Sequence, residues 1–177
     1  MATSSIRCGA GVTREIGMDL ADLGLRRVMV LTDAHLSRLP PVATVLQSLE
    51  DNGIAFALFD RVRVEPNDRS FQDAIAFARE TDCDGFVAVG GGSTMDTAKA
   101  ANLYSTYPPA EFLDYVNPPI GKGKPVPGPV KPLIAVPTTA GTGSETTGVA
   151  IFDLALPGAG HAKTGIAHRR QKPTLGI

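Results

Sequence analysis

The sequence predicts an α/β domain with an open parallel sheet and helices on both of its faces. Two observations support this fold class: strand-like and helix-like segments alternate along the chain, and the strand-like segments are almost continuously apolar. A length of 177 residues is typical of one domain with a sizeable core, and 43% hydrophobic residues argue against disorder. We therefore expect residues 1–177 to form one domain.

Five short segments rich in apolar and β-branched residues are expected to form strands. Their nearly continuous apolar character is typical of strands that are covered on both faces of a sheet. The expected strands are 27–33, 53–60, 85–89, 132–137 and, as a fifth candidate, 149–153.

Apolar residues that recur every three or four positions predict four helices between these strands. Thr13 and Asp68 are expected to cap the first and third helices, and Gly24 to end the first. The helices are expected from Thr13 to Leu23, from Pro40 to Asn52, from Asp68 through Ala78, and from Ser93 to Tyr104.

Residues 108–132 interrupt this alternation and are rich in proline. Part of the segment, 121–128, resembles a flexible linker. Because a strand and a glycine-rich motif follow directly, we expect a long ordered excursion beside the functional site instead.

Charge and cysteine content exclude several classes of protein. Seventeen basic and eighteen acidic residues give a net charge of −1, so neither a nucleic-acid-binding surface nor a polyanionic tail is expected. Cys8 and Cys83 are too few for a disulfide scaffold and favour a reducing compartment. No run of eighteen apolar residues occurs, so no membrane span is expected. The first seven residues lack the features of a targeting presequence.

Residues 89–99 (VGGGSTMDTAK) place three glycines between a buried strand and a helix. Glycines allow backbone N–H groups to approach a phosphate, and the start of the helix adds its positive end. The same residues would also form an ordinary turn, with Ser93 as the cap and Asp96 at the third helical position. Because Asp96 would repel a pyrophosphate, we expect it to order the loop and line the pocket.

Residues 136–145 (VPTTAGTGSE) form a second loop after a strand, with four hydroxyl groups and two glycines within seven positions. Such groups at the carboxyl ends of parallel strands suit a nucleotide or a sugar, although a self-capped Ser/Thr-rich loop is the alternative. Two such loops on one sheet favour binding. Asp33, at the end of an early strand, would accept ribose hydroxyls or act only as a cap.

Several common motifs are missing from the sequence. The dinucleotide fingerprint GxGxxG does not follow the first strand, and neither the P-loop motif nor the GxSxG motif occurs. The three histidines, His35, His161 and His168, are scattered and lack the spacing of ligands on one helix. We expect them at the surface rather than at a metal.

Residues 90–99 together with 137–145 resemble the iron-containing alcohol dehydrogenase family, and the resemblance covers nearly all of the chain. Further stretches resemble one branch of that family, the hydroxyacid-oxoacid transhydrogenases. These stretches are 6–7, 62–66, 101–104, 112–115, 119–125 and 146–153.

The resemblance implies that residues 1–177 form a Rossmann-like dinucleotide-binding domain with NAD as cofactor. In the family, an all-helical domain follows and holds a catalytic divalent metal through one Asp and three His. Those ligands lie beyond the segment that is 172–177 here, so none is expected in this chain, and no catalytic residue is assigned. The resemblance implies cofactor-binding roles for Asp33, Asn67, Gly91, Gly92, Ser93, Asp96, Thr138, Thr139, Thr142 and Lys163.

The resemblance also implies an activity on small hydroxyacids and oxoacids. In this branch a hydride passes from 4-hydroxybutyrate to the cofactor, which gives succinic semialdehyde, and then to 2-oxoglutarate, which gives 2-hydroxyglutarate. The implied location is the mitochondrial matrix in a eukaryote and otherwise the cytoplasm. A homo-oligomer is possible as the quaternary structure. Two alternatives remain: a catalytically inactive NAD-binding fragment, and another metal-dependent alcohol or glycerol dehydrogenase that uses zinc.

Overall fold

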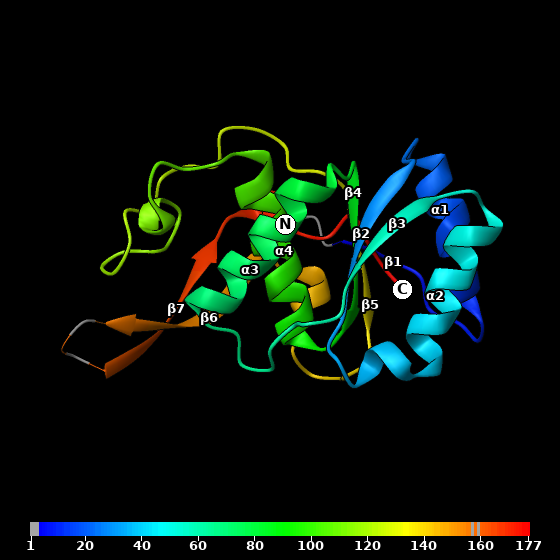
Figure 1. The fold of residues 1–177 in the computed structure, drawn as a ribbon, viewed down its shortest axis with the longest axis horizontal. Coiled ribbons are helices and arrows are strands. Elements are labelled where there is room, and N and C mark those ends of the chain that lie inside the picture. The colour runs from blue at the N-terminus through cyan, green and yellow to red at the C-terminus, as the bar shows by residue number, and fades with distance from the viewer. Residues whose placement is uncertain (1–3, 157, 159) are drawn as a thin grey trace.

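The main sheet has six parallel strands in the order β1-β8-β5-β4-β2-β3 (Figure 1). The structure, a computed structural model, describes residues 4–156, 158 and 160–177. Four predicted strands lie at the centre and one edge of this sheet, which confirms the predicted fold class. The strands are β1 (Ser5–Ile6), β2 (Arg27–Leu31), β3 (Ala55–Phe59), β4 (Gly85–Gly90), β5 (Leu133–Pro137) and β8 (Leu175–Gly176).

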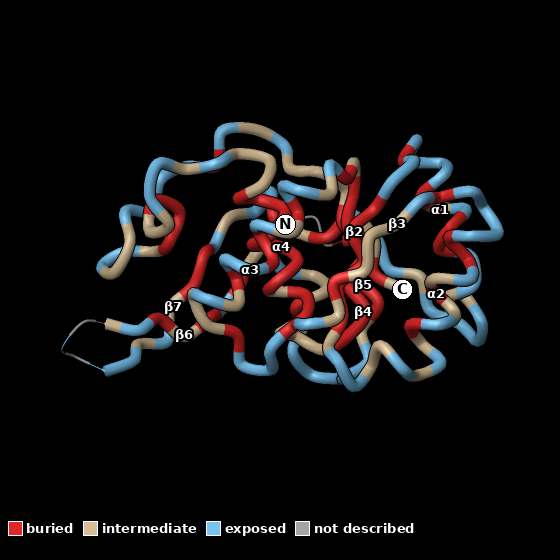
Figure 2. The backbone as a smooth tube through the Cα atoms, viewed as in Figure 1, coloured by how far each residue is buried: buried red, intermediate tan, exposed pale blue. Residues whose placement is uncertain are grey.

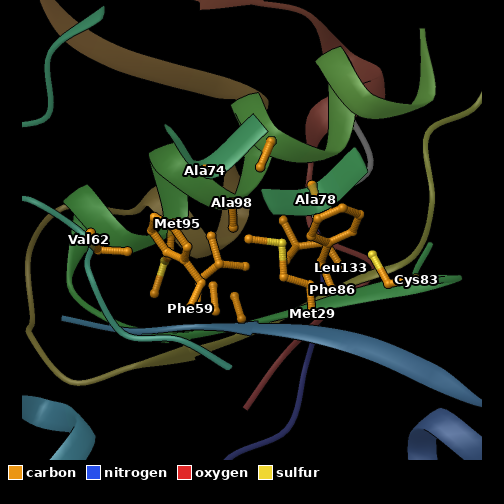
Figure 3. Close-up of a cluster of buried hydrophobic side chains, with 14 residues drawn as sticks. Met29, Phe59, Val62, Ala74, Ala78, Cys83, Phe86, Met95, Ala98 and Leu133 are labelled. Carbon is orange, nitrogen blue, oxygen red and sulfur yellow. The ribbon is translucent and has the colours of Figure 1, made fainter. Parts of the chain in front are cut away.

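Helices cover both faces of the sheet (Figure 1). On one face, Val28 and Val30 of β2 pack with buried residues of α1 (Ile16–Asp22) and α2 (Pro40–Asp51). On the other face, Met29 and Leu31 pack with α3 (Asp68–Thr81) and α4 (Gly92–Thr106) (Figure 3). Successive side chains of a strand point to opposite faces, so a strand covered on both faces is apolar at every position.

Helix α4 is buried along most of its length, because it lies between the sheet and a third layer (Figure 2). That layer includes a two-stranded antiparallel sheet of β6 (Val149–Leu156) and β7 (Gly160–Ala167). The fifth predicted strand therefore exists, but it does not belong to the parallel sheet. Burial alternates along β6, with Ala150 and Phe152 buried and Ile151 exposed, as expected for a strand covered on one face only.

Helix starts differ from the predicted caps. A short 3₁₀ helix, η1 (Val12–Glu15), precedes α1, and Thr13 lies inside it rather than at a cap. Asn67, and not Asp68, caps α3: its side chain accepts a hydrogen bond from the Ser70 N–H, and the Ser70 hydroxyl accepts one from the Asn67 N–H. Gly24 ends the first helical segment with a φ of 74°, as predicted.

The proline-rich segment is ordered, but it does not lie beside the glycine-rich loops. It contains η3 (Phe112–Asp114) and packs on the C-terminal end of α4, where the Tyr104 hydroxyl donates to the Phe112 carbonyl. Helix α4 begins at the carboxyl end of β4 and runs back along the sheet (Figure 1). The C-terminal end of α4 therefore lies near the amino ends of the strands, whereas the glycine-rich loops lie at their carboxyl ends. The predicted position was therefore wrong. The segment instead supports β7, since Asn117 exchanges hydrogen bonds with Gly165 and Ala167.

Asp114 anchors this segment through two lysines. Its side chain is 2% exposed, and its oxygens lie 3.0 Å from Lys122 Nζ and 3.1 Å from Lys124 Nζ. The hydrogen bond from Lys122, assisted by Lys124, lowers the pKa of Asp114 to about 2 although burial opposes the shift. The contribution of this carboxylate to stability is therefore present above its ordinary pKa near 4 and is lost as the pH falls toward 2.

We expect Asp114→Asn to lower the melting temperature at pH 7 by roughly 2–4 °C, because one carboxylate bridges two ammonium groups. The difference from the wild type should vanish as the pH falls from about 4 to 2. Thermal melts over this pH range test the prediction. Glu111→Gln is the matched control, since Glu111 also contacts Lys122 but is 67% exposed. Equal losses for both variants would show that the buried carboxylate has no special role.

Candidate functional site

Two glycine-rich loops leave the sheet side by side. β4 and β5 are paired neighbours, with Gly90 opposite Pro137, and the Thr138 N–H donates to the Gly90 carbonyl at 3.0 Å. The first loop passes through Gly91 directly into α4, and the second continues into η4 (Ser144–Thr146). The two motifs found in the sequence therefore meet at one edge of the sheet.

The glycines of the first loop lie against the hydroxyl-bearing residues of the second. A Cβ atom at Gly91 would lie 3.0 Å from Thr139 Oγ1, and one at Gly92 would lie 3.2 Å from Thr142 Cγ2. Any larger residue would fill the space in front of the first turn of α4. The first N–H groups of a helix have no partner within it and carry partial positive charge, so this open turn suits a phosphate.

Cavities lie on both sides of this helix start. One, of about 420 Å³, is bounded by apolar side chains as well as by Asp33 and both loops. The other, of about 470 Å³, lies toward the β6–β7 hairpin. Gly92 and Ser93 line both cavities, so the start of α4 separates them. Cavities of this size are typical of small-molecule sites.

The two cavities bring together nearly all of the predicted site residues. Only Asn67 lines neither cavity, and its side-chain oxygen caps α3. The predicted residues of the first cavity are Asp33, Gly91, Gly92, Ser93, Thr138 and Thr139, and those of the second are Gly92, Ser93, Asp96, Thr142 and Lys163.

Asp33 has the geometry for both roles considered from the sequence. Its Oδ1 accepts hydrogen bonds from the His35 and Leu36 N–H groups, both at 2.9 Å, and so caps η2 (Leu36–Arg38). Within the described part of the chain, Oδ2 accepts no hydrogen bond from protein. One oxygen therefore orders the turn, and the other is not needed for it.

Asp96 connects the two loops and the hairpin. Its Oδ1 accepts from the Ser144 hydroxyl at 2.8 Å, and its Oδ2 accepts from the Ile151 N–H at 3.2 Å. Burial raises the pKa of Asp96, while the bond from Ser144 and the charge of Lys99 oppose the rise. These contacts confirm the expected loop-ordering role, and Asp96 lines the second cavity.

The predicted capping box at the start of α4 is wrong. The N-cap residue is Gly91, so no side chain caps the helix. The Ser93 hydroxyl instead accepts a hydrogen bond from the Glu65 N–H at 3.2 Å. Ser93 thereby fixes the loop between β3 and α3 beside the start of α4. Asp96 is occupied by Ser144 and Ile151 and does not return to the cap.

Apolar wall residues were not predicted as parts of the site. Leu36, Val62 and Val64 line the first cavity, and Val64 is 71% exposed. The exposure of Val64 is visible only in the structure, so the sequence held no local signal for this wall. Apolar walls of this kind suit an aromatic base.

A metal ion does not fit the described residues. Within residues 4–156, 158 and 160–177, no group of three or more His, Cys, Asp or Glu side chains is placed to hold one. We therefore derive no reaction step through a metal. Over the same residues, no helix combines the length and apolar character required to cross a membrane.

Comparison with known proteins assigns the fold and the two loops to a family. Residues 3–177 match the family of iron-containing alcohol dehydrogenases. The chain belongs to the iron-containing alcohol dehydrogenase family. It is 64% identical to the mitochondrial hydroxyacid-oxoacid transhydrogenase of Mus musculus and 66% identical to that of Xenopus laevis, each over the whole chain.

The similarity extends to solved structures. The NAD⁺ complex of sulfoacetaldehyde reductase from Bifidobacterium kashiwanohense matches with a TM-score of 0.82 and 29% identity, over 99% of this chain and 44% of that one. The chain spans 37% and 38% of the length of the mouse and frog relatives. The similarity therefore concerns a little over a third of each relative.

Proposed function

We propose that this chain is the NAD(H)-binding domain of a hydroxyacid-oxoacid transhydrogenase. The observation that carries the proposal is the pair of loops that meet at the start of α4, between two cavities of suitable size. High identity to relatives named hydroxyacid-oxoacid transhydrogenase supports the branch, and the NAD⁺-bound structural relative supports the cofactor.

The residues present fit an extended dinucleotide. The open first turn of α4 accepts the pyrophosphate, because Gly91 and Gly92 leave its N–H groups accessible. Asp33 accepts ribose hydroxyls through its free oxygen, and the cavity wall with Val62 and Val64 covers the adenine. The second cavity then takes the nicotinamide half, where bound NAD supplies a carbon that accepts and donates hydride.

The other site residues orient the cofactor rather than react with it. Thr138, Thr139 and Thr142 offer hydroxyl groups along the second loop, and Lys163 offers a cation from β7 at the far wall of the second cavity. Asp96 holds Ser144 and the hairpin in place. Because both of its carboxylate oxygens accept hydrogen bonds there, its negative charge is directed away from the phosphates. Asn67 remains a proposed cofactor residue through its amide group.

For the whole protein, the proposal includes hydride transfer from 4-hydroxybutyrate to 2-oxoglutarate by way of bound NAD. The catalytic metal would be held by residues other than those described here, so its ligands are not assigned. For a eukaryotic source, the proposed location is the mitochondrial matrix, and the relatives' names, which include the word mitochondrial, support the organelle; for any other source it is the cytoplasm. The proposal also includes a homo-oligomer.

Titration of the chain with NADH and NADPH tests the proposed cofactor. We expect NADH to bind at least about tenfold more tightly, because a 2′-phosphate would meet the Asp33 carboxylate. Asp33→Gly should narrow this preference, and Asp33→Asn should narrow it while keeping an oxygen that caps η2.

Asp60→Asn is the matched control, since Asp60 follows the neighbouring strand β3 and lines neither cavity. It should leave the preference for NADH unchanged. Tighter binding of NADPH by the wild-type chain would show that Asp33 does not contact the ribose.

A further inference from the structure

Lys99 is a buried cation on α4 to which neither the sequence motif nor the proposed function gives a role. The residue is 1% exposed, although lysine is almost never fully buried unless it is paired. Its position is on the face of α4 toward η4 and β6. Burying a charge costs free energy unless the charge is paired and hydrogen-bonded, so the contacts of this cation are informative.

All three protons of the Lys99 ammonium group are used. Nζ donates to the Ser144 carbonyl at 2.7 Å, to the Ser144 hydroxyl at 2.7 Å and to the Val149 carbonyl at 2.9 Å. The Ser144 hydroxyl in turn donates to Asp96 Oδ1, which lies 3.8 Å from Nζ. One cation thus joins α4 to the start of η4 and to the start of β6.

These partners form walls of the second cavity. Ser144 and Val149 line it on one side, and Gly92, Ser93 and Asp96 line it from α4. The bonds of Lys99 therefore connect lining residues from three different elements of the space that would take the nicotinamide half. A buried apolar side chain would often stabilise a fold equally well, so stability alone gives weak grounds for a charge at this position.

We infer that Lys99 is a positioning residue for the cofactor, which fastens the second glycine-rich loop and β6 to α4 and so sets the width of the nicotinamide cavity. This inference rests on the proposed NAD(H) binding. Lys99 would not contact the cofactor, and its effect would pass through Ser144 and Val149.

The protonation state of Lys99 provides a readout for this role. Burial lowers its pKa to about 8, while the charges of Asp96 on α4 and Glu145 on η4 oppose the change. The other charged side chains around the cavity are Glu65, Asp153 on β6 and Lys163 on β7. A neutral Lys99 would have two protons for three acceptors and would no longer balance the charge of Asp96.

Titration of NADH into the wild-type chain and into Lys99→Met at several pH values tests the inference. At pH 7 we expect Lys99→Met to weaken NADH binding about tenfold. The wild type should lose affinity between about pH 7 and pH 9.5, and the variant should lack this step. The matched control is Lys131→Met, because Lys131 donates to the Cys83 carbonyl and lines neither cavity. Lys131→Met should bind NADH at pH 7 with the affinity of the wild type, and it should lose affinity over the same pH range as the wild type.

The outcomes separate a positioning role from a structural one. A Lys99→Met chain that melts earlier but binds NADH with wild-type affinity and the same pH step would overturn the inference while leaving the proposed function intact. A wild-type chain that does not bind NADH would overturn the proposed function and the inference with it. If Lys99→Met does not fold, Ser144→Ala decides: about threefold weaker binding supports the inference, and unchanged binding overturns it.

Discussion

Replacing Gly91 with valine is expected to abolish NADH binding and to leave the chain folded. Gly91 has φ −83° and ψ −168°, an extended conformation that any residue adopts, so the backbone itself tolerates the change. A Cβ atom there would lie 3.0 Å from Thr139 Oγ1, and the two methyl groups of valine would occupy the cavity in front of α4. We expect affinity to fall by at least about 100-fold, as measured by calorimetry.

Gly91→Ala should give a smaller loss, because it adds a single carbon in the same place. Ala21→Val is the control for folding and handling, since it adds a β-branched side chain at an exposed position of α1, far from the loops. Circular dichroism melts should show that all three variants fold. Unchanged NADH binding by Gly91→Val would mean that the triple glycine serves only as a turn.

The central strands and both helical layers could be predicted from the sequence because burial on two faces leaves a strong local pattern. Val28 and Met29, adjacent in β2, pack into different clusters on opposite faces, which is why residues 28–31 include no polar position. The strands β1 and β8, at one side of the sheet, have two residues each, which is too short for any periodicity to show.

Features that depend on distant partners could not be predicted in this way. Asn67 and Asp68 are both good caps, and only the Ser70 hydroxyl, which bonds back to Asn67, decides between them. β6 resembles the other strands in composition, but its partner is β7 and not the parallel sheet. Ile151 is exposed on the free face of β6, but as an apolar residue it gave no sign of that face in the sequence.

For the site, the sequence identified many residues of the two loops that line the cavities, but neither the apolar wall nor the bonds that hold the loops. The glycines and threonines of both loops have a distinctive spacing, and the register of β4 with β5 brings them together. The bonds from Lys99 to Ser144 and Val149 span 45 and 50 residues and leave no local pattern. Such contacts become visible only when the chain is folded.

Residues 1–177 alone are expected to bind NADH but to show no turnover of 4-hydroxybutyrate. Hydride transfer requires the alcohol oxygen to be held and polarised beside the nicotinamide, and a metal ion fixed by several ligands can do both. The described residues offer no group of three or more side chains for that purpose. The measurement is the formation of 2-hydroxyglutarate from 2-oxoglutarate with 4-hydroxybutyrate as the hydride donor, together with metal analysis of the purified chain.

Fusion to the remaining part of the mouse relative, which is 64% identical over these 177 residues, should raise the rate at least about a thousandfold. The reason is our proposal that the catalytic metal is held outside the described residues, since metal polarisation lowers the barrier by several kcal/mol. The same fusion with Gly91→Val should lose that rate, because the added domain would still depend on the cofactor site of this chain. Stoichiometric metal together with turnover by the unfused chain would contradict the prediction and place the catalytic ligands within residues 1–177. A fusion that gains activity despite Gly91→Val would instead show that the cofactor binds elsewhere.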